Sequence, residues 1–118
     1  MRYYPAAIGL GLVLAVTSSV GIARQEIRPT DPRAEVLIDE AAANLAAGDN
    51  DSAQGYYEAA LAVDPASRNA ILGLAAVARQ NGLPGKAIKY YREVQELYPN
   101  DVAAIAGEGE ALAERGAI

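Results

Sequence analysis

The stretch GYYEAALAVDP at residues 55–65 returns in outline as KYYREVQELYP at residues 89–99. In both stretches a pair of tyrosines precedes a proline at the same spacing, and the two copies are offset by 34 residues. Because different kinds of residue repeat in one register, the chain contains a repeated structural unit. Other positions that share the register are Gly48, Gly82 and Gly116; Ala53 and Ala87; and Leu37, Ile71 and Ile105.

Each unit contains two segments with the composition of a helix. The first segment ends at a glycine, which adopts a left-handed turn at little cost, and the second ends at a proline, which cannot continue a helix. We predict Asp51 as an N-cap residue, and Pro84 suits the first turn of a helix. The predicted first helices are residues 34–48 and 68–82, and the predicted second helices are residues 51–65 and 84–99.

Small and aromatic side chains alternate where the two helices of a unit would meet. Tyr57 and Tyr91 lie one turn after an alanine on the same helix face, and we expect them to fill the groove between helices. The tyrosine before each of them, Tyr56 or Tyr90, is expected to stay half-exposed. The alanines that would let the paired helices approach closely are Ala41, Ala53, Ala75 and Ala87.

This pattern resembles that of the tetratricopeptide repeat family over residues 34–118. The departures from the family pattern are Glu40, Asn44, Ala78 and Val94. The resemblance implies an all-α fold of stacked antiparallel helix hairpins that form a short right-handed solenoid. The matching residues are Leu37, Ala41, Ala53, Tyr57, Ala60 and Pro65 in the first unit, and Ile71, Leu74, Ala75, Ala87, Tyr91 and Pro99 in the second.

The predicted domain spans residues 34–118, with repeats at 34–67 and 68–101 and a single helix at 102–118. We expect one face of that last helix to cover the end of the stack, as a capping helix does. That apolar face carries Val102, Ile105, Gly109 and Leu112, and the opposite, water-facing side carries Glu110 and Glu114. The alternative is that the chain has been cut and a second helix once followed.

The N-terminal 23 residues have the layout of a secretory signal peptide. Arg2 gives a positive start, residues 6–16 are apolar, and Gly21 and Ala23 suit a cleavage site. The alternative is an uncleaved membrane anchor, since the apolar stretch is close to the length that spans a bilayer. Both interpretations place the repeats outside the cytoplasm, either in the periplasm or anchored to the inner membrane facing it. Residues 24–33 are predicted to form an extended linker.

The composition excludes several classes of function. The chain carries a formal charge of −5, which disfavours nucleic acid as a partner. It has no Cys and no His, which removes disulfides, Cys–His and Ser–His–Asp catalysis, and metal sites built on those residues. Paired carboxylates such as Glu108 and Glu110 are interpreted as a solvated helix face. We therefore predict no enzyme, no small-molecule substrate, no cofactor and no catalytic or metal-binding residue.

The family resemblance implies that the first helices line a hollow binding side. Its floor would be small and apolar, and Arg79 would be available to pair with an acidic group of the partner. The expected function is a non-catalytic adaptor in the bacterial cell envelope that binds another protein or a peptide, in tasks such as pilus or secretion-system assembly. The alternative is a self-associating scaffold anchored in the inner membrane, with membrane contact only through the N-terminal segment. The predicted partner-binding residues are Glu35, Ile38, Ala42, Leu45, Asn69, Leu72, Ala76, Arg79 and Gln80.

Overall fold

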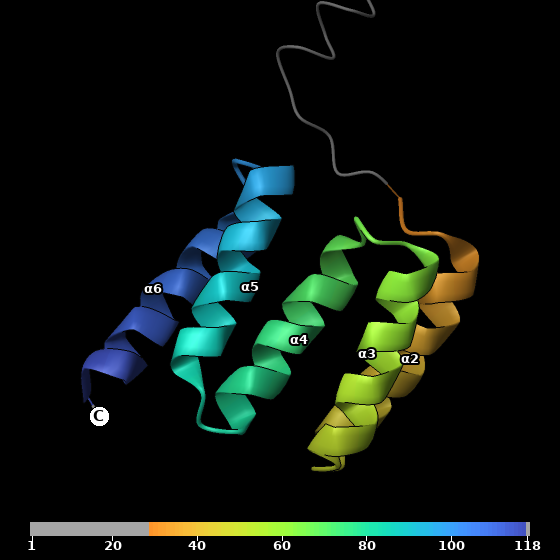
Figure 1. Ribbon diagram of the computed structural model, residues 1–118, viewed down its shortest axis with the longest axis horizontal. Coiled ribbons are helices and arrows are strands. Elements are labelled where there is room, and N and C mark those ends of the chain that lie inside the picture. The colour runs from red at the N-terminus through yellow and green to blue at the C-terminus, as the bar shows by residue number, and fades with distance from the viewer. Residues whose placement is uncertain (1–28, 118) are drawn as a thin grey trace, which may run out of the picture.

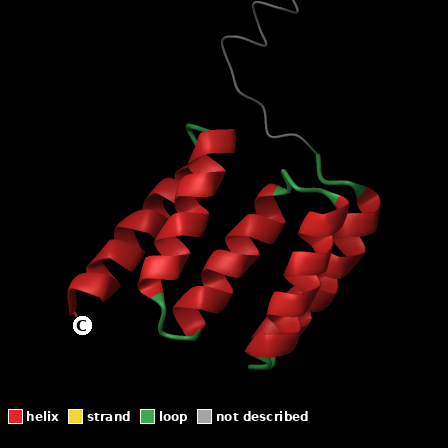
Figure 2. Cartoon of the chain, viewed as in Figure 1, coloured by secondary structure: helices red, strands yellow, loops and turns green. Residues whose placement is uncertain are grey.

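The computed structural model describes residues 29–117, which form helices joined by short loops and contain no strand (Figures 1 and 2). The all-α prediction is confirmed. The predicted signal or anchor at residues 1–23 lies outside the described residues, as do residues 24–28 of the predicted linker. The predicted end of the linker at residue 33 is wrong, because Pro32 suits a first helical turn and Asp31 caps it, so that Pro32 and Arg33 already belong to the first described helix. The helices of the described part are α2 (Pro32–Ala46), α3 (Asn50–Val63), α4 (Arg68–Gln80), α5 (Pro84–Leu97) and α6 (Val102–Ala117).

The helices stack in chain order, and each packs on the next one. Figure 1 shows α2 behind α3 at one end of the stack and α6 at the other end. The first helices of the two repeats, α2 and α4, also contact each other directly, so they belong to one layer. The prediction of stacked helix hairpins is confirmed.

The glycines predicted to end the first helices do so. Gly48 has φ +86° and Gly82 has φ +73°, a conformation that costs a glycine little and other residues more. The residue after each glycine donates its backbone N–H to a carbonyl in the last turn of the preceding helix. The N···O distance is 2.9 Å from Asp49 to Asn44 and 2.8 Å from Leu83 to Ala78, so the two turns have the same hydrogen bond at equivalent positions.

The prediction that Asp51 caps α3 is wrong. The N-cap is Asp49, whose Oδ1 accepts the backbone N–H of Ser52 at 3.1 Å, and Asp51 lies inside the helix. The turn after the glycine is so short that the helix begins earlier than predicted. The prediction for Pro84 is confirmed, since it occupies the first turn of α5.

The core is built mainly from alanine, with a buried tyrosine, Tyr57 or Tyr91, in each of its two clusters. The four alanines predicted to bring helices close together are all fully buried. Tyr57 and Tyr91 are only 4% and 6% exposed, while Tyr56 and Tyr90 keep partial exposure, as predicted. One apolar cluster joins α2, α3 and α4 around Tyr57, and a second joins α4, α5 and α6 around Tyr91.

Tyr57 and Tyr91 each lie against a glycine of the following repeat. A Cβ atom placed on Gly73 of α4 would lie 2.2 Å from Cε1 of Tyr57, and one placed on Gly107 of α6 would lie 2.4 Å from Cε1 of Tyr91. The ring therefore occupies the space that any larger residue would need. The tyrosines fill the joint between successive repeats as well as the groove within a hairpin.

The predicted orientation of the last helix is wrong, because its apolar face points to solvent. Val102 is 78% exposed, Ile105 is 50% exposed and Leu112 is 37% exposed. The side that packs on the stack is made of small residues instead. These buried residues are Ala104, Gly107 and Ala111.

The tyrosine contact explains this rotation of α6. The Tyr91 ring projects from α5 toward α6. The helix can approach the ring only if the residue opposite it has no side chain, and Gly107 is that residue. The opposite rotation would place larger side chains on the ring. The observed rotation also turns Glu110 and Glu114 toward Arg79 of α4 rather than toward open water.

Candidate functional site

The structure leaves most of the predicted binding residues accessible. Ile38 is the exception, since it is 8% exposed and belongs to the core cluster around Tyr57. Its side chain therefore supports the fold. Of the other predicted residues, Ala42, Asn69 and Gln80 are exposed, and Glu35, Leu45, Leu72, Ala76 and Arg79 are partly exposed.

The last helix extends this layer, and none of its residues is among the predicted binding residues. The positions of α6 that lie one repeat after Asn69, Leu72 and Ala76 are Ala103, Ala106 and Glu110, and all three are exposed. The signal for this position is the 34-residue register, which the third unit shares with the two repeats. The inner face is defined here as the surface formed by Ala42, Leu45, Leu72, Ala76, Gln80 and Ala106.

Arg79, at the edge of the inner face, is held by acceptors within the chain. Its Nη2 lies 3.0 Å from Oε2 of Glu110, and its Nε donates to Oε1 of Glu114 at 2.8 Å. Its Nη1 lies 3.5 Å from the hydroxyl of Tyr91. The hydrogen bond to Glu114, followed by that to Tyr91, raises the pKa of Arg79. The guanidinium thus ties α4 to α6.

A hollow of about 350 Å³ lies beside this ion-pair cluster. It brings together three of the predicted residues, Ala76, Arg79 and Gln80, with Tyr91 and Glu114. The hollow shows that the inner face is indented at the point where α4 meets α6.

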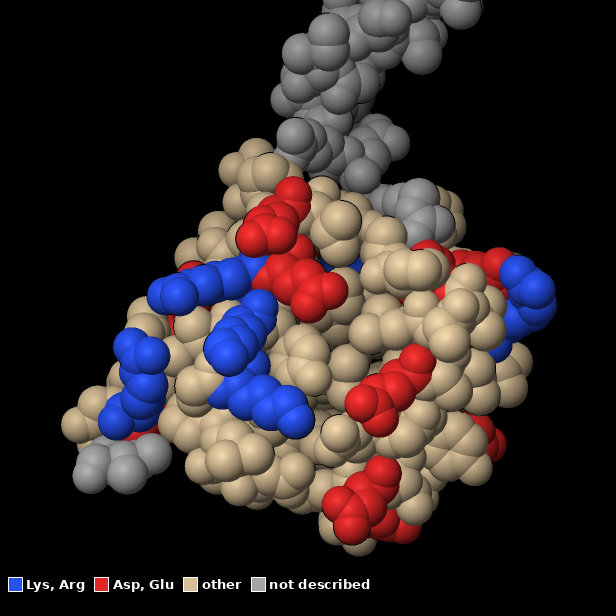
Figure 3. Space-filling view, viewed as in Figure 1, with Lys and Arg blue, Asp and Glu red and all other residues tan. Residues whose placement is uncertain are grey.

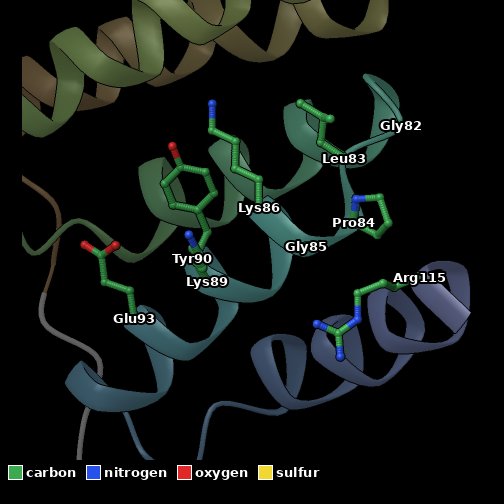
Figure 4. Close-up of a pocket in the computed structure, with 9 residues that line it drawn as sticks. All are labelled: Gly82, Leu83, Pro84, Gly85, Lys86, Lys89, Tyr90, Glu93 and Arg115. Atoms are coloured by element: carbon green, nitrogen blue, oxygen red, sulfur yellow. The ribbon is translucent and has the colours of Figure 1, made fainter.

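A larger hollow of about 830 Å³, which we call the outer pocket, borders the start of α5 and was not predicted (Figure 4). Leu83 and Tyr90 give it apolar walls, and its cations are Lys86, Lys89 and Arg115. Figure 3 shows that most Lys and Arg side chains on this side gather at the end of the stack formed by α5 and α6. The outer pocket is therefore a basic area on an acidic protein.

Glu108 and Asp101 do not have the properties of a general acid. A general acid needs a raised pKa to keep its proton at neutral pH. Hydrogen bonds from Gln95 and then Arg92 lower the pKa of Glu108, and the hydrogen bond from Arg68 lowers the pKa of Asp101. Within residues 29–117, no group of three acidic side chains is placed to hold a metal ion. None of the described helices combines the length and apolarity needed to span a membrane.

Comparison with known proteins gave one family match. A family model described as "Tetratricopeptide repeat" matches residues 38–102, which is more than half of the chain. The matched region begins in α2 and ends at the start of α6. A search of curated proteins found no matching relative.

Proposed function

Since the chain belongs to the tetratricopeptide repeat family, we propose that it is a non-catalytic adaptor that binds another protein or a peptide on its inner face. Repeats of this family generally mediate protein–protein interaction. Stacked helix pairs also create extended surfaces suited to that task. The observation that carries the proposal is the row of accessible small and apolar residues, among them Leu72 and Ala76, along the layer of first helices.

The charges at the inner face favour one kind of partner. Arg79 already binds Glu110 and Glu114, so it offers little to an acidic partner group. Glu35 adds a further, partly exposed negative charge at the α2 end. Complementary charges across an interface promote the association of two proteins and fix how they align. We therefore propose an apolar partner segment, extended or helical, with a basic residue at its flank.

The proposed location is the bacterial periplasm, with residues 1–23 as a cleaved signal peptide. The support is the sequence pattern of Arg2, the apolar residues 6–16 and the small residues Gly21 and Ala23. A role in envelope assembly, such as pilus or secretion-system assembly, follows as the finer proposal. The alternative is an uncleaved anchor that holds a self-associating scaffold at the inner membrane.

Cell fractionation with mass measurement separates these two locations. A cleaved protein beginning at Arg24 and released with the soluble periplasm supports the adaptor. A full-length chain that stays with the membrane fraction supports the anchored scaffold.

Capture of partners from an envelope extract tests the binding surface. The test variants are Leu72→Glu and Ala42→Glu, which place a charge on the inner face. The matched control is Leu97→Glu on α5, because Leu97 is also exposed, at 43%, but lies outside the inner face. Arg79→Glu is not suitable, since it would set three carboxylates together and loosen α6. We expect both test variants to lose a protein that the control retains, and the proposal is wrong if both retain every captured protein.

A further inference from the structure

The exposed stripe of α6 corresponds to a covered stripe of α4. We call Ile105, Gly109, Leu112 and Gly116 the end stripe. One repeat earlier, Ile71, Ala75 and Ala78 are buried in the same cluster as residues of α5. Ile71 is fully buried, whereas its counterpart Ile105 is 50% exposed. Within the described chain, the end stripe is thus a helix-packing face on which no helix lies.

The end stripe is complementary to itself when two copies run antiparallel. Its residues alternate large and small at the spacing of a helix seam. If two α6 helices cross between Glu110 and Ala111, Ile105 meets the partner subunit's Gly116 and Leu112 meets the partner subunit's Gly109. A Cβ atom placed on either glycine meets nothing within 4 Å, so the space is open for these side chains.

A parallel arrangement would lack this fit. It would set leucine against leucine and glycine against glycine, with crowding in one layer and a void in the next. Both defects weaken packing. The same antiparallel sense is used inside the chain, where each repeat pairs its two helices as a hairpin.

The charges beside the end stripe agree with the antiparallel order. The stripe itself carries no charge, and Arg115 at its edge is exposed and forms no ion pair within residues 29–117. Glu108 lies two turns earlier on the same edge of α6, where Arg92 and Gln95 of α5 bind its carboxylate. In the antiparallel arrangement Arg115 would lie beside the partner subunit's Glu108 as a second cation, and the two-fold axis would repeat this contact.

We propose that the chain forms a two-fold dimer through the end stripe, in which each α6 covers the other as α5 covers α4. This interface is closed, because one surface of each subunit binds the same surface of the other. It leaves the α2 and α4 residues of each inner face free and does not depend on the proposed adaptor function. Two inner faces in one particle would strengthen binding to a partner that has two copies of a segment.

Sedimentation equilibrium of the full chain tests the dimer. We expect a concentration-dependent dimer mass, and we expect Leu112→Glu to weaken the dimer at least ~100-fold, because each dimer loses two buried leucines. The control is Val36→Glu, a charge placed on a residue that is 63% exposed on α2, at the other end of the stack. Circular dichroism should show the same helix content in both variants, since neither changes a buried residue.

Cross-linking tests the direction of the helices. The chain has no Cys, so introduced thiols are unambiguous. A mixture of the Gly109→Cys and Leu112→Cys variants should form disulfide-linked heterodimers on mild oxidation, and each variant alone should cross-link far less. Efficient cross-linking of each variant with itself would indicate parallel helices and overturn the proposed interface.

Two further results would also overturn it. One is a monomer at all concentrations, which would assign the end stripe to another polypeptide. The other is a dimer that survives Leu112→Glu, which would place self-association elsewhere, for example in the N-terminal segment. Loss of partner capture by Leu72→Glu tests the inner face alone, so the two proposals fail independently.

Discussion

Replacing Gly73 by alanine should destabilise the protein, although alanine is the better helix former. In water-exposed helix interiors, alanine is favoured over glycine by about 1 kcal/mol. At Gly73, however, the new methyl carbon would lie 2.2, 2.3 and 2.7 Å from three ring carbons of Tyr57. Carbon atoms pack at about 3.5–4.0 Å, so the ring and α4 must separate by more than an ångström.

The size of the effect follows from these two opposing terms. Crowding a well-packed core costs about 1–3 kcal/mol, and the upper end applies because Tyr57 is 4% exposed and a rigid ring cannot bend aside. After the gain of about 1 kcal/mol in helix propensity, the net loss is about 2 kcal/mol. For a domain of this size that lowers Tm by about 8–16 °C.

Gly55→Ala is the matched control. Gly55 and Gly73 each occupy the sixth position of their helix, but a Cβ atom on Gly55 meets nothing within 4 Å. Urea unfolding followed by circular dichroism should therefore show Gly55→Ala gaining about 1 kcal/mol while Gly73→Ala loses stability. If the two substitutions stabilise the protein alike, the tyrosine does not hold the joint between repeats.

A double-mutant cycle locates the clash. Tyr57→Leu removes the ring and lowers the free energy of unfolding by itself. In that background, Gly73→Ala should cause little further loss of stability. We expect a favourable coupling free energy of at least about 1 kcal/mol between the two substitutions. Purely additive effects would contradict the contact.

Three other changes test separate features of the fold. Tyr91→Ala should cost about 3 kcal/mol or more in urea unfolding, because it empties the second joint. The Arg68 guanidinium lowers the pKa of Asp101, so its contribution to stability is present above the ordinary carboxyl pKa of about 4 and is lost as the pH falls through the lower folded value. The urea midpoint of the wild type should therefore drop in acid more than that of Asp101→Asn, and equal pH profiles would contradict this. Asp49→Ala should lower Tm while Asp51→Ala leaves it nearly unchanged, and the reverse order would restore Asp51 as the cap of α3.

Sequence patterns predicted the helices and their order because local residues determine their ends. Glycine and proline terminate helices through backbone geometry alone, so Gly48, Gly82 and Pro84 could be assigned without tertiary information. The cap of α3 was misplaced by a few residues, since Asp49 and Asp51 offer the same chemistry and the turn geometry chooses between them.

The rotation of α6 could not be predicted from hydrophobicity, which favoured burial of Ile105 and Leu112. The deciding contact is a ring from another helix against a residue without a side chain. The available signal was that Gly73 and Gly107 share the 34-residue register with each other.

The candidate site shows the same limit. Accessible small residues such as Ala42 and Ala76 lie on the layer that the family pattern implied. The burial of Ile38 and the pairing of Arg79 with Glu110 depend on contacts between helices that are distant in sequence. Residue type alone does not reveal whether a cation is already neutralised.

The tyrosine–glycine contact has a consequence for how such a chain can grow. The ring comes from one unit and the glycine from the next, so the segment of residues 68–101 contains one of each, Gly73 and Tyr91. Tandem duplication of such a segment would insert a module that docks correctly on both neighbours at once. Longer proteins of the same curvature could then arise without any new contact having to evolve.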